Sequence, residues 1–195
     1  MKSVIPFTLA LLLSSILGLY SISAFALPTT LSGINIVTQK PETTALDTGS
    51  SAENLVVIFL SAKCPCSNSH IEAIKTLAKD FPNTRFVAIH SNFDEDQAST
   101  EAYFKNVGLP FSVIQDVKSQ YANQFHALKT PHAFVLNSKG DLLYQGGVSD
   151  SHDFKKSKHQ YLREALNDLK KGQAVQTKEG RTLGCVITRE DGNAW

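Results

Sequence analysis

A continuous apolar stretch that runs straight into two cysteines constrains the fold of this chain more than any other segment. Residues 55–60 are apolar throughout and include valine, isoleucine and phenylalanine, which is typical of a fully buried strand. Apolar residues then recur at helical spacing over residues 67–81, and Pro82 ends the pattern. Cys64 and Cys66 therefore lie between a strand end and a helix start, where the helix dipole lowers the pKa of a thiol and exposes the reactive thiolate.

The rest of the chain alternates between strand and helix patterns. Residues 85–90 predict a second strand, parallel to the first and joined to it by a right-handed crossover. Asp94 and Gln97 resemble a capping box at the start of a helix. The other expected elements are a loop at 43–51, a helix at 94–107, a strand at 111–114, a helix capped by Asp116 through Phe125, a hairpin at 133–136 and 141–145, and a last helix closed by Gly172. This order predicts an α/β sandwich with a central sheet whose antiparallel edge comes last.

The first 26 residues predict a secretory signal. Lys2 precedes an apolar region, and the small residues Ala24 and Ala26 form the pattern that precedes a cleavage site after Ala26. The alternative is an uncleaved membrane anchor. We expect a mature chain with one domain at 27–172 and a polar C-terminal tail at 173–195.

Charge and location follow from this division. The whole chain carries a formal charge of +1, and removal of Lys2 with the signal balances its charges. We therefore expect no nucleic-acid partner, no stable membrane insertion after signal cleavage, and a periplasmic or secreted location.

All three cysteines, Cys64, Cys66 and Cys185, lie in the exported part. An oxidising compartment permits disulfides, but three cysteines are too few to staple a domain of this size. The odd number leaves at least one thiol free or paired with another molecule. The cysteines are therefore placed for reactivity.

Taken together, the strand, the Cys-Pro-Cys helix start, and Thr130-Pro131 before an antiparallel hairpin and a last helix resemble the thioredoxin fold. Within it, the chain resembles the redoxin branch related to peroxiredoxins, the alkyl hydroperoxide reductase/thiol-specific antioxidant group. The resemblance covers residues 55–171, and residues 94–114 match an insertion of that branch. It implies a three-layer sandwich, a central mixed sheet with helices on both faces, and Cys64 as the attacking thiol. It also implies a cis peptide bond before Pro131, facing that thiol and shaping an edge that can pair with a substrate.

The chain departs from these families at several positions. Only Pro65 separates the two cysteines, and Ser67 stands where thioredoxins have their second cysteine. Lys63 replaces the thioredoxin tryptophan. Ser61 fits the serine or threonine that peroxiredoxins place three residues before their peroxidatic cysteine, but Val57 occupies their proline position.

Each thiol has alternative roles. Cys64 is expected as the nucleophile, and otherwise as a buried structural cysteine. Cys66 is a disulfide partner, a soft metal ligand, or a small residue in the first helical turn. Cys185 is a resolving cysteine that attacks a sulfenic acid or mixed disulfide on Cys64 or Cys66, and otherwise a free or structural thiol. The Ser61 hydroxyl contacts the thiolate or a peroxide, or it satisfies backbone groups at the strand end.

Histidines offer a metal-binding alternative. His70 lies four residues after Cys66 on the same side of the helix, and His132 follows Pro131. Together with Cys64 and Cys66, they could form a soft copper or zinc site. His90 is expected farther from the thiols and His152 as an ordinary surface residue.

The predicted function is an exported thiol–disulfide oxidoreductase with a possible peroxide-reducing activity. No organic cofactor is expected, because a partner redox protein would supply or accept electrons. The substrate would be a protein disulfide or a hydroperoxide. The alternatives are a copper-binding chaperone that uses Cys64, Cys66 and a histidine, and a non-catalytic binding module of the same fold.

Overall fold

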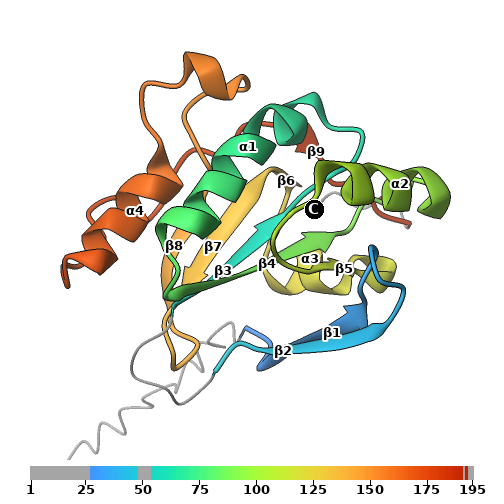
Figure 1. Cartoon of the computed structure of the whole chain (residues 1–195), viewed down its shortest axis with the longest axis horizontal. Coiled ribbons are helices and arrows are strands. Elements are labelled where there is room, and N and C mark those ends of the chain that lie inside the picture. Colours follow the sequence, from blue (N-terminus) through green and yellow to red (C-terminus); the bar gives the residue numbers. More distant parts are fainter. Residues whose placement is uncertain (1–26, 48–53, 191, 193–195) are drawn as a thin grey trace, which may run out of the picture.

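The strand that leads to the cysteines lies at the centre of a mixed five-stranded sheet (Figure 1). The computed structural model describes residues 27–47, 54–190 and 192, so the predicted signal at 1–26 lies outside the described residues. The strand order is β5-β4-β3-β7-β8. The strands are β3 (Asn54–Phe59), β4 (Thr84–His90), β5 (Val113–Gln115), β7 (His132–Leu136) and β8 (Leu142–Gly146). The pairs β3·β4 and β4·β5 are parallel, whereas β7 and β8 are antiparallel, as the sequence predicts.

Helices cover both faces of this sheet, which confirms the predicted three-layer sandwich. One face carries α1 (Pro65–Asp80) and α4 (Tyr161–Lys170). Phe104 of α2 (Gln97–Val107) packs into the core on this face. The other face carries α3 (Gln120–Gln124) and a hairpin of β1 (Thr30–Ile34) and β2 (Pro41–Ala45).

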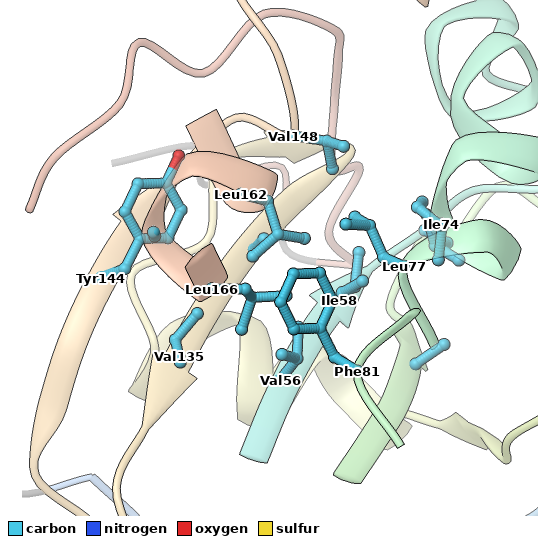
Figure 2. Close-up of a cluster of buried hydrophobic side chains, with 14 of the residues drawn as sticks. Val56, Ile58, Ile74, Leu77, Phe81, Val135, Tyr144, Val148, Leu162 and Leu166 are labelled. Atoms are coloured by element: carbon cyan, nitrogen blue, oxygen red, sulfur yellow. The ribbon is translucent and has the colours of Figure 1, made fainter. Parts of the chain in front are cut away.

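Alternation along β3 divides the core between the two faces. Val56 and Ile58 pack with Leu77 of α1 and Leu166 of α4 on one side (Figure 2). Leu55, Val57 and Phe59 pack on the other side. Because β3 is buried on both faces, its sequence is apolar throughout. The β3 C-terminus, and with it Cys64, is therefore held by a fully packed strand.

Three boundaries differ from the sequence expectations. The loop predicted at 43–51 is wrong where β2 continues to Ala45, because the threonines of this exposed hairpin suit a strand without an apolar alternation. The helix α2 begins at Gln97 with Asp96, not Asp94, as its cap, and the Asp96 carboxylate accepts the Ser99 N–H at 2.9 Å. The helix predicted through Phe125 is divided, because positive φ angles at Lys118 and Ser119 separate a short 3-10 turn (Val117–Ser119) from α3.

The predicted C-terminal tail is paired with the domain. Its strand β9 (Cys185–Val186) lies antiparallel to β6 (Lys129–Thr130), the short strand before Pro131 (Figure 1). The Ile187 side chain is fully buried in the core of the α3 face. Within the described part of the chain, no helix has both the length and the apolar character that a membrane crossing requires.

Candidate active site: a cluster of three thiols

Cys64 is the N-cap residue of α1, with an extended backbone and Pro65 in the first turn of the helix. Its sulfur accepts the Ser67 N–H at 3.5 Å, a position usually filled by a side-chain oxygen. In the thiol form, Cys64 donates to the Thr130 carbonyl oxygen at 3.2 Å. Only 2% of the Cys64 surface is exposed. The Cys64 sulfur is thus buried between a helix N-terminus and the strand that precedes Pro131.

The three cysteine sulfurs form one cluster. The Sγ atoms of Cys64, Cys66 and Cys185 all lie within 4.8 Å of one another, and none is in a disulfide. Helix α1 supplies two of them, and β9 supplies the third because Cys185 pairs directly with Thr130. The structure therefore brings together all three thiols that the sequence singled out.

Ionisation differs among the three thiols. Burial opposes ionisation of Cys64, but hydrogen bonds from the Cys185 thiol and the Ser67 N–H outweigh it and lower the pKa of Cys64. Burial and the negative charge of Cys64 raise the pKa of Cys66. Burial and the interactions with Cys64 raise the pKa of Cys185 to about 12. Ionisation of the cluster is thus favoured at Cys64 over the other two thiols.

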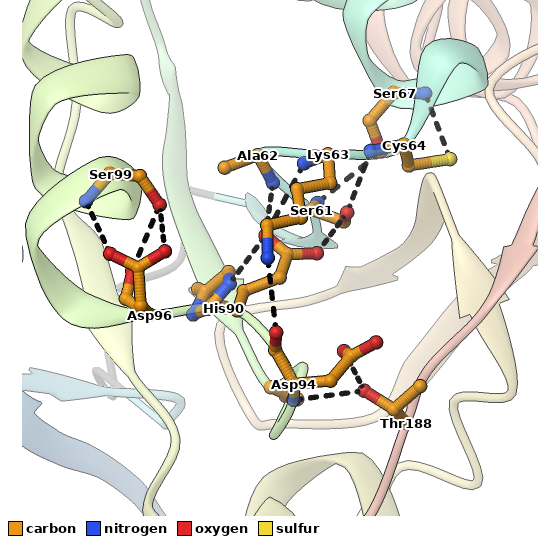
Figure 3. A network of polar contacts seen from close by, with 12 residues as sticks. Ser61, Ala62, Lys63, Cys64, Ser67, His90, Asp94, Asp96, Ser99 and Thr188 are labelled. Atoms are coloured by element: carbon orange, nitrogen blue, oxygen red, sulfur yellow. Dashed lines mark hydrogen bonds and ion pairs between the residues drawn. The ribbon is translucent and has the colours of Figure 1, made fainter.

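A buried carboxylate holds the loop that carries Cys64. The Ser61 hydroxyl donates to Glu95 Oε1 at 2.5 Å and accepts the Cys64 N–H at 2.9 Å. Glu95 Oε2 accepts the Ala62 N–H at 2.8 Å and the His90 Nε2–H at 3.1 Å. Figure 3 shows His90, Ser61, Ala62 and Cys64 joined through these bonds. Ser61 therefore serves the backbone of the loop rather than the Cys64 sulfur, which favours the second of its two predicted roles.

Sequence reasoning missed Glu95, which lay inside the predicted helix at 94–107. Burial opposes its ionisation, but hydrogen bonds from His90 and Ser61 and the Ala62 N–H lower the pKa of its carboxyl. His90, expected far from the thiols, reaches their loop through this carboxylate. A signal existed in the sequence, because an acidic residue soon after a strand end in a parallel sheet lies at the same edge as Cys64.

The two predicted histidine ligands lie outside the cluster. His70 uses both ring nitrogens, with Nδ1 2.7 Å from the Cys66 carbonyl oxygen and Nε2 2.8 Å from Ser149 Oγ. His132 points to the α3 face, where its ring centroid is 4.4 Å from that of Phe134. Burial lowers the pKa of His132 to about 4. Neither histidine belongs to the group of potential metal ligands found among the described residues.

His152 is closer to the thiols than the sequence suggested. Its Nδ1 lies 3.2 Å from Cys66 Sγ, so the expectation of an ordinary surface residue is wrong. The loop after β8 returns to α1, where Ser69 Oγ donates to the His152 carbonyl oxygen at 3.0 Å. This contact depends on two segments far apart in the sequence, which explains why local patterns did not indicate it.

The peptide bond between Thr130 and Pro131 is cis, as the resemblance implied. The backbone edge before Pro131 is paired with β9. Gly184 makes this close approach possible, since a Cβ added there would lie 1.9 Å from the Thr130 oxygen at a φ of +151°. The edge that the resemblance assigns to a substrate is thus occupied by the chain's own C-terminal segment.

We expect Gly184→Ala to displace β9 from β6 and to destabilise the domain by about 1–3 kcal/mol, because the methyl group would overlap backbone atoms. The Cys185 thiol should then react faster with a thiol reagent in the reduced chain. Thermal unfolding and mass-spectrometric labelling measure the two effects. Gly192→Ala is the control, since Gly192 has a φ of +67° but no heavy atom within 4 Å of an added Cβ. Equal labelling of Cys185 in both variants would contradict this prediction.

Comparison with known proteins identifies a family and a fold. A family model described as "Domain of unknown function (DUF6436)" matches residues 35–188. No curated protein matches the chain. A crystal structure of an uncharacterized conserved protein from Geobacillus kaustophilus is 23% identical, with a TM-score of 0.74 over 88% of this chain and 96% of that one. A hypothetical protein from Sinorhizobium meliloti 1021 is 26% identical, with a TM-score of 0.72 over 86% of this chain and 96% of its own.

A more distant structure connects the fold to a named class. The thioredoxin domain of a thiol-disulfide oxidoreductase from Bacteroides vulgatus is 10% identical, with a TM-score of 0.51 over 64% of this chain and 89% of that one. Together with the strand order and the cis Thr130–Pro131 bond, this likeness confirms the predicted thioredoxin-like fold.

Proposed function

The chain belongs to the DUF6436 family, and from its three thiols we propose that it is a thiol–disulfide oxidoreductase with Cys64 as nucleophile and Cys185 as resolving thiol. The single observation that carries the proposal is that β9 holds Cys185 opposite Thr130, with its sulfur within 4.8 Å of Cys64 Sγ. The thiolate is concentrated on Cys64, and the thiolate is the form that attacks sulfur.

The exchange has two steps. The Cys64 thiolate attacks one sulfur of a substrate disulfide, which forms a mixed disulfide and releases the other substrate sulfur as a thiolate. The Cys185 thiol then gives up its proton and attacks Cys64 Sγ, which expels the second substrate thiolate and leaves a Cys64–Cys185 disulfide. The substrate gains two electrons and two protons in all. A dithiol redox partner returns the chain to its reduced form, without an organic cofactor.

Cys185 is a better resolving thiol than Cys66. A disulfide between Cys64 and Cys66 would close a small, strained ring, because one residue separates them. Cys185 arrives on a separate strand and already interacts with the Cys64 sulfur. The Cys66 sulfur instead contacts His152 Nδ1 at 3.2 Å.

Hydroperoxides are a second oxidant class, in keeping with the resemblance to the redoxin branch. Cys64 is 2% exposed and the neighbouring edge is paired with β9, an arrangement that favours a small oxidant. The Cys64 thiolate would attack the terminal peroxide oxygen, which releases an alcohol or water and leaves a sulfenic acid. Cys185 would then attack the sulfenic sulfur and release water, which gives the same Cys64–Cys185 disulfide.

The proposal places the protein outside the cytoplasm, in the periplasm or among secreted proteins. One support is the apolar N-terminal segment with the small residues before Leu27. The other is the proposed use of cysteine thiols, which an oxidising compartment allows to form disulfides. We propose no nucleic-acid partner, since the formal charge of the whole chain is only +1.

Disulfide mapping of the mature chain tests the proposal. After treatment with oxidised glutathione or with hydrogen peroxide, we expect peptide mass spectrometry to find Cys64 joined to Cys185. Cys66→Ser should form the same bond, because Cys66 is not the resolving thiol. A bond between Cys64 and Cys66 alone would refute the role of Cys185. An unreactive Cys64 would instead support the alternative of a non-catalytic binding module.

A further inference from the structure

The reduced thiol cluster has the composition of a metal site. Its three sulfurs come from two elements, α1 and β9, and all lie within 4.8 Å of one another. Thiolate sulfur is a soft ligand that selects Cu(I) and Zn(II) among the biological metals. The thiol–disulfide proposal uses two of these sulfurs and leaves Cys66 without a part in the reaction.

The spacing of the sulfurs suits a metal held between them. Metal–sulfur bonds in proteins are about 2.3 Å long, so three sulfurs around a trigonal centre lie about 4.0 Å apart. The cluster's upper limit of 4.8 Å needs a contraction of less than about 1 Å, which small χ1 rotations provide. Two of the three ligands lie at the N-terminus of α1, Cys64 as its N-cap and Cys66 in its first turn, where the helix dipole stabilises negative sulfur.

The number of ligands distinguishes between the two metals. Structural zinc sites are almost always four-coordinate. Among the described residues, the cluster contains three ligands, and the predicted fourth ligands are absent from it. Both His70 ring nitrogens are hydrogen-bonded elsewhere, and the His132 ring packs against Phe134. His152 contacts Cys66 Sγ but does not belong to the group of mutually close ligand atoms. A donor set of three thiolates is therefore better matched to Cu(I).

We infer that the reduced chain binds one Cu(I) ion through the sulfurs of Cys64, Cys66 and Cys185. Three Cu–S bonds form as the protons that the thiols still hold are released to solvent, and the copper remains Cu(I), so no electrons are transferred. The site differs from the predicted copper alternative because Cys185 replaces the histidines. Binding and the Cys64–Cys185 disulfide exclude each other, since both use the same two sulfurs.

Competition for Cu(I) tests this inference. The reduced mature chain is titrated without oxygen into the coloured complex of Cu(I) with bicinchoninate. We expect one equivalent of Cu(I) to be withdrawn from the chelator. Cys66→Ser and Cys185→Ser should each weaken binding by more than the roughly 10–100-fold that loss of an outer-shell partner costs. His152→Gln removes an outer-shell contact of Cys66 and serves as the comparison, so its loss of Cu(I) affinity should not exceed that roughly 10–100-fold range.

The outcomes separate this inference from the redox proposal. Failure to withdraw Cu(I), or equal binding by Cys185→Ser, would overturn the three-sulfur site. A loss in His152→Gln as large as in the cysteine variants would also overturn it, in favour of a histidine ligand. Circular dichroism of each variant shows whether it is folded, and Cys66→Ser serves as the second sulfur variant if Cys185→Ser loses its structure. A chain that forms the Cys64–Cys185 disulfide but binds no copper would disprove this inference alone.

Discussion

Cys64→Ser is expected to lower the rate of disulfide exchange by about a thousandfold or more, which corresponds to ~4 kcal/mol of activation free energy. A serine hydroxyl is scarcely ionised at neutral pH, whereas the pKa of the Cys64 thiol is lowered. Cys66 does not replace it, because burial and the neighbouring charge raise the pKa of Cys66. Reduction of a small aromatic disulfide, followed by absorbance, measures the loss.

The same substitution should change the pH profile of alkylation. The reaction rate with iodoacetamide follows the thiolate fraction, so it falls about tenfold per pH unit below the pKa of the reacting thiol. Because the pKa of Cys64 is lowered, the parent chain should keep a fast phase at pH values where an ordinary cysteine is protonated. Cys64→Ser should lose that phase and react only at high pH, where Cys66 and Cys185 ionise.

Cys66→Ser is the matched control, since it removes a thiol from the same helical turn. It should retain the fast phase and most of the exchange rate. If Cys66→Ser loses the fast phase while Cys64→Ser keeps it, the assignment of the nucleophile is wrong.

Local sequence was sufficient for the central unit of the fold. The apolar run of β3, the helix period of α1 and the cysteines between them are neighbours in the chain, so their patterns determine how they lie together. The cis bond of Thr130-Pro131 was expected from the resemblance to the thioredoxin fold, which keeps such a proline before its antiparallel hairpin. The hairpin of β1 and β2 was missed, since its polar, exposed residues lack the alternation that indicates a strand.

The candidate site depended on contacts that no local pattern carries. The position of Cys185 is determined by the pairing of β9 with β6, by the bond from Ile187 N–H to the Leu128 carbonyl oxygen at 2.9 Å, and by the burial of Ile187. A short polar tail gives no sign of this register. Glu95 likewise reaches the loop of Cys64, and His152 reaches the Cys66 sulfur, from separate loops. Residue types could therefore nominate the cysteines, but the reason to propose Cys185 as the resolving thiol comes only from the structure.

The self-pairing of the C-terminal segment links the two proposals. While β9 is paired with β6, Cys185 lies close enough to Cys64 to form a disulfide with it, and the three sulfurs lie together. An extended protein substrate would need the same backbone edge and would have to displace β9. The paired state thus favours small oxidants and soft metal ions, whereas the open state would admit a polypeptide.

Glu95→Ala is expected to destabilise the domain by ~3–5 kcal/mol, because it removes one member of a buried pair and leaves the other without its partner. The side chains of Glu95 and His90 are 2% and 1% exposed. Loss of the carboxylate would also leave the Ser61 hydroxyl and the Ala62 N–H without their acceptor. The midpoint of thermal unfolding should fall by about 6–20 °C for a domain of this size.

The neighbouring Asp96 provides a matched control for the charge. Its exposed carboxylate caps α2, so Asp96→Ala should lower the midpoint of thermal unfolding much less than Glu95→Ala.

Acid unfolding adds an independent measurement with Glu95→Gln. Because the folded pKa of Glu95 is lowered, its contribution is present above the unfolded pKa and is lost as the pH falls through the folded pKa. Glu95→Gln should therefore lose less stability than the parent between neutral and acidic pH. Since the carboxylate positions the loop of Cys64, the fast alkylation phase should also slow in Glu95→Gln while persisting in Asp96→Ala. Equal destabilisation by Glu95→Ala and Asp96→Ala would show that the buried network does not support this loop.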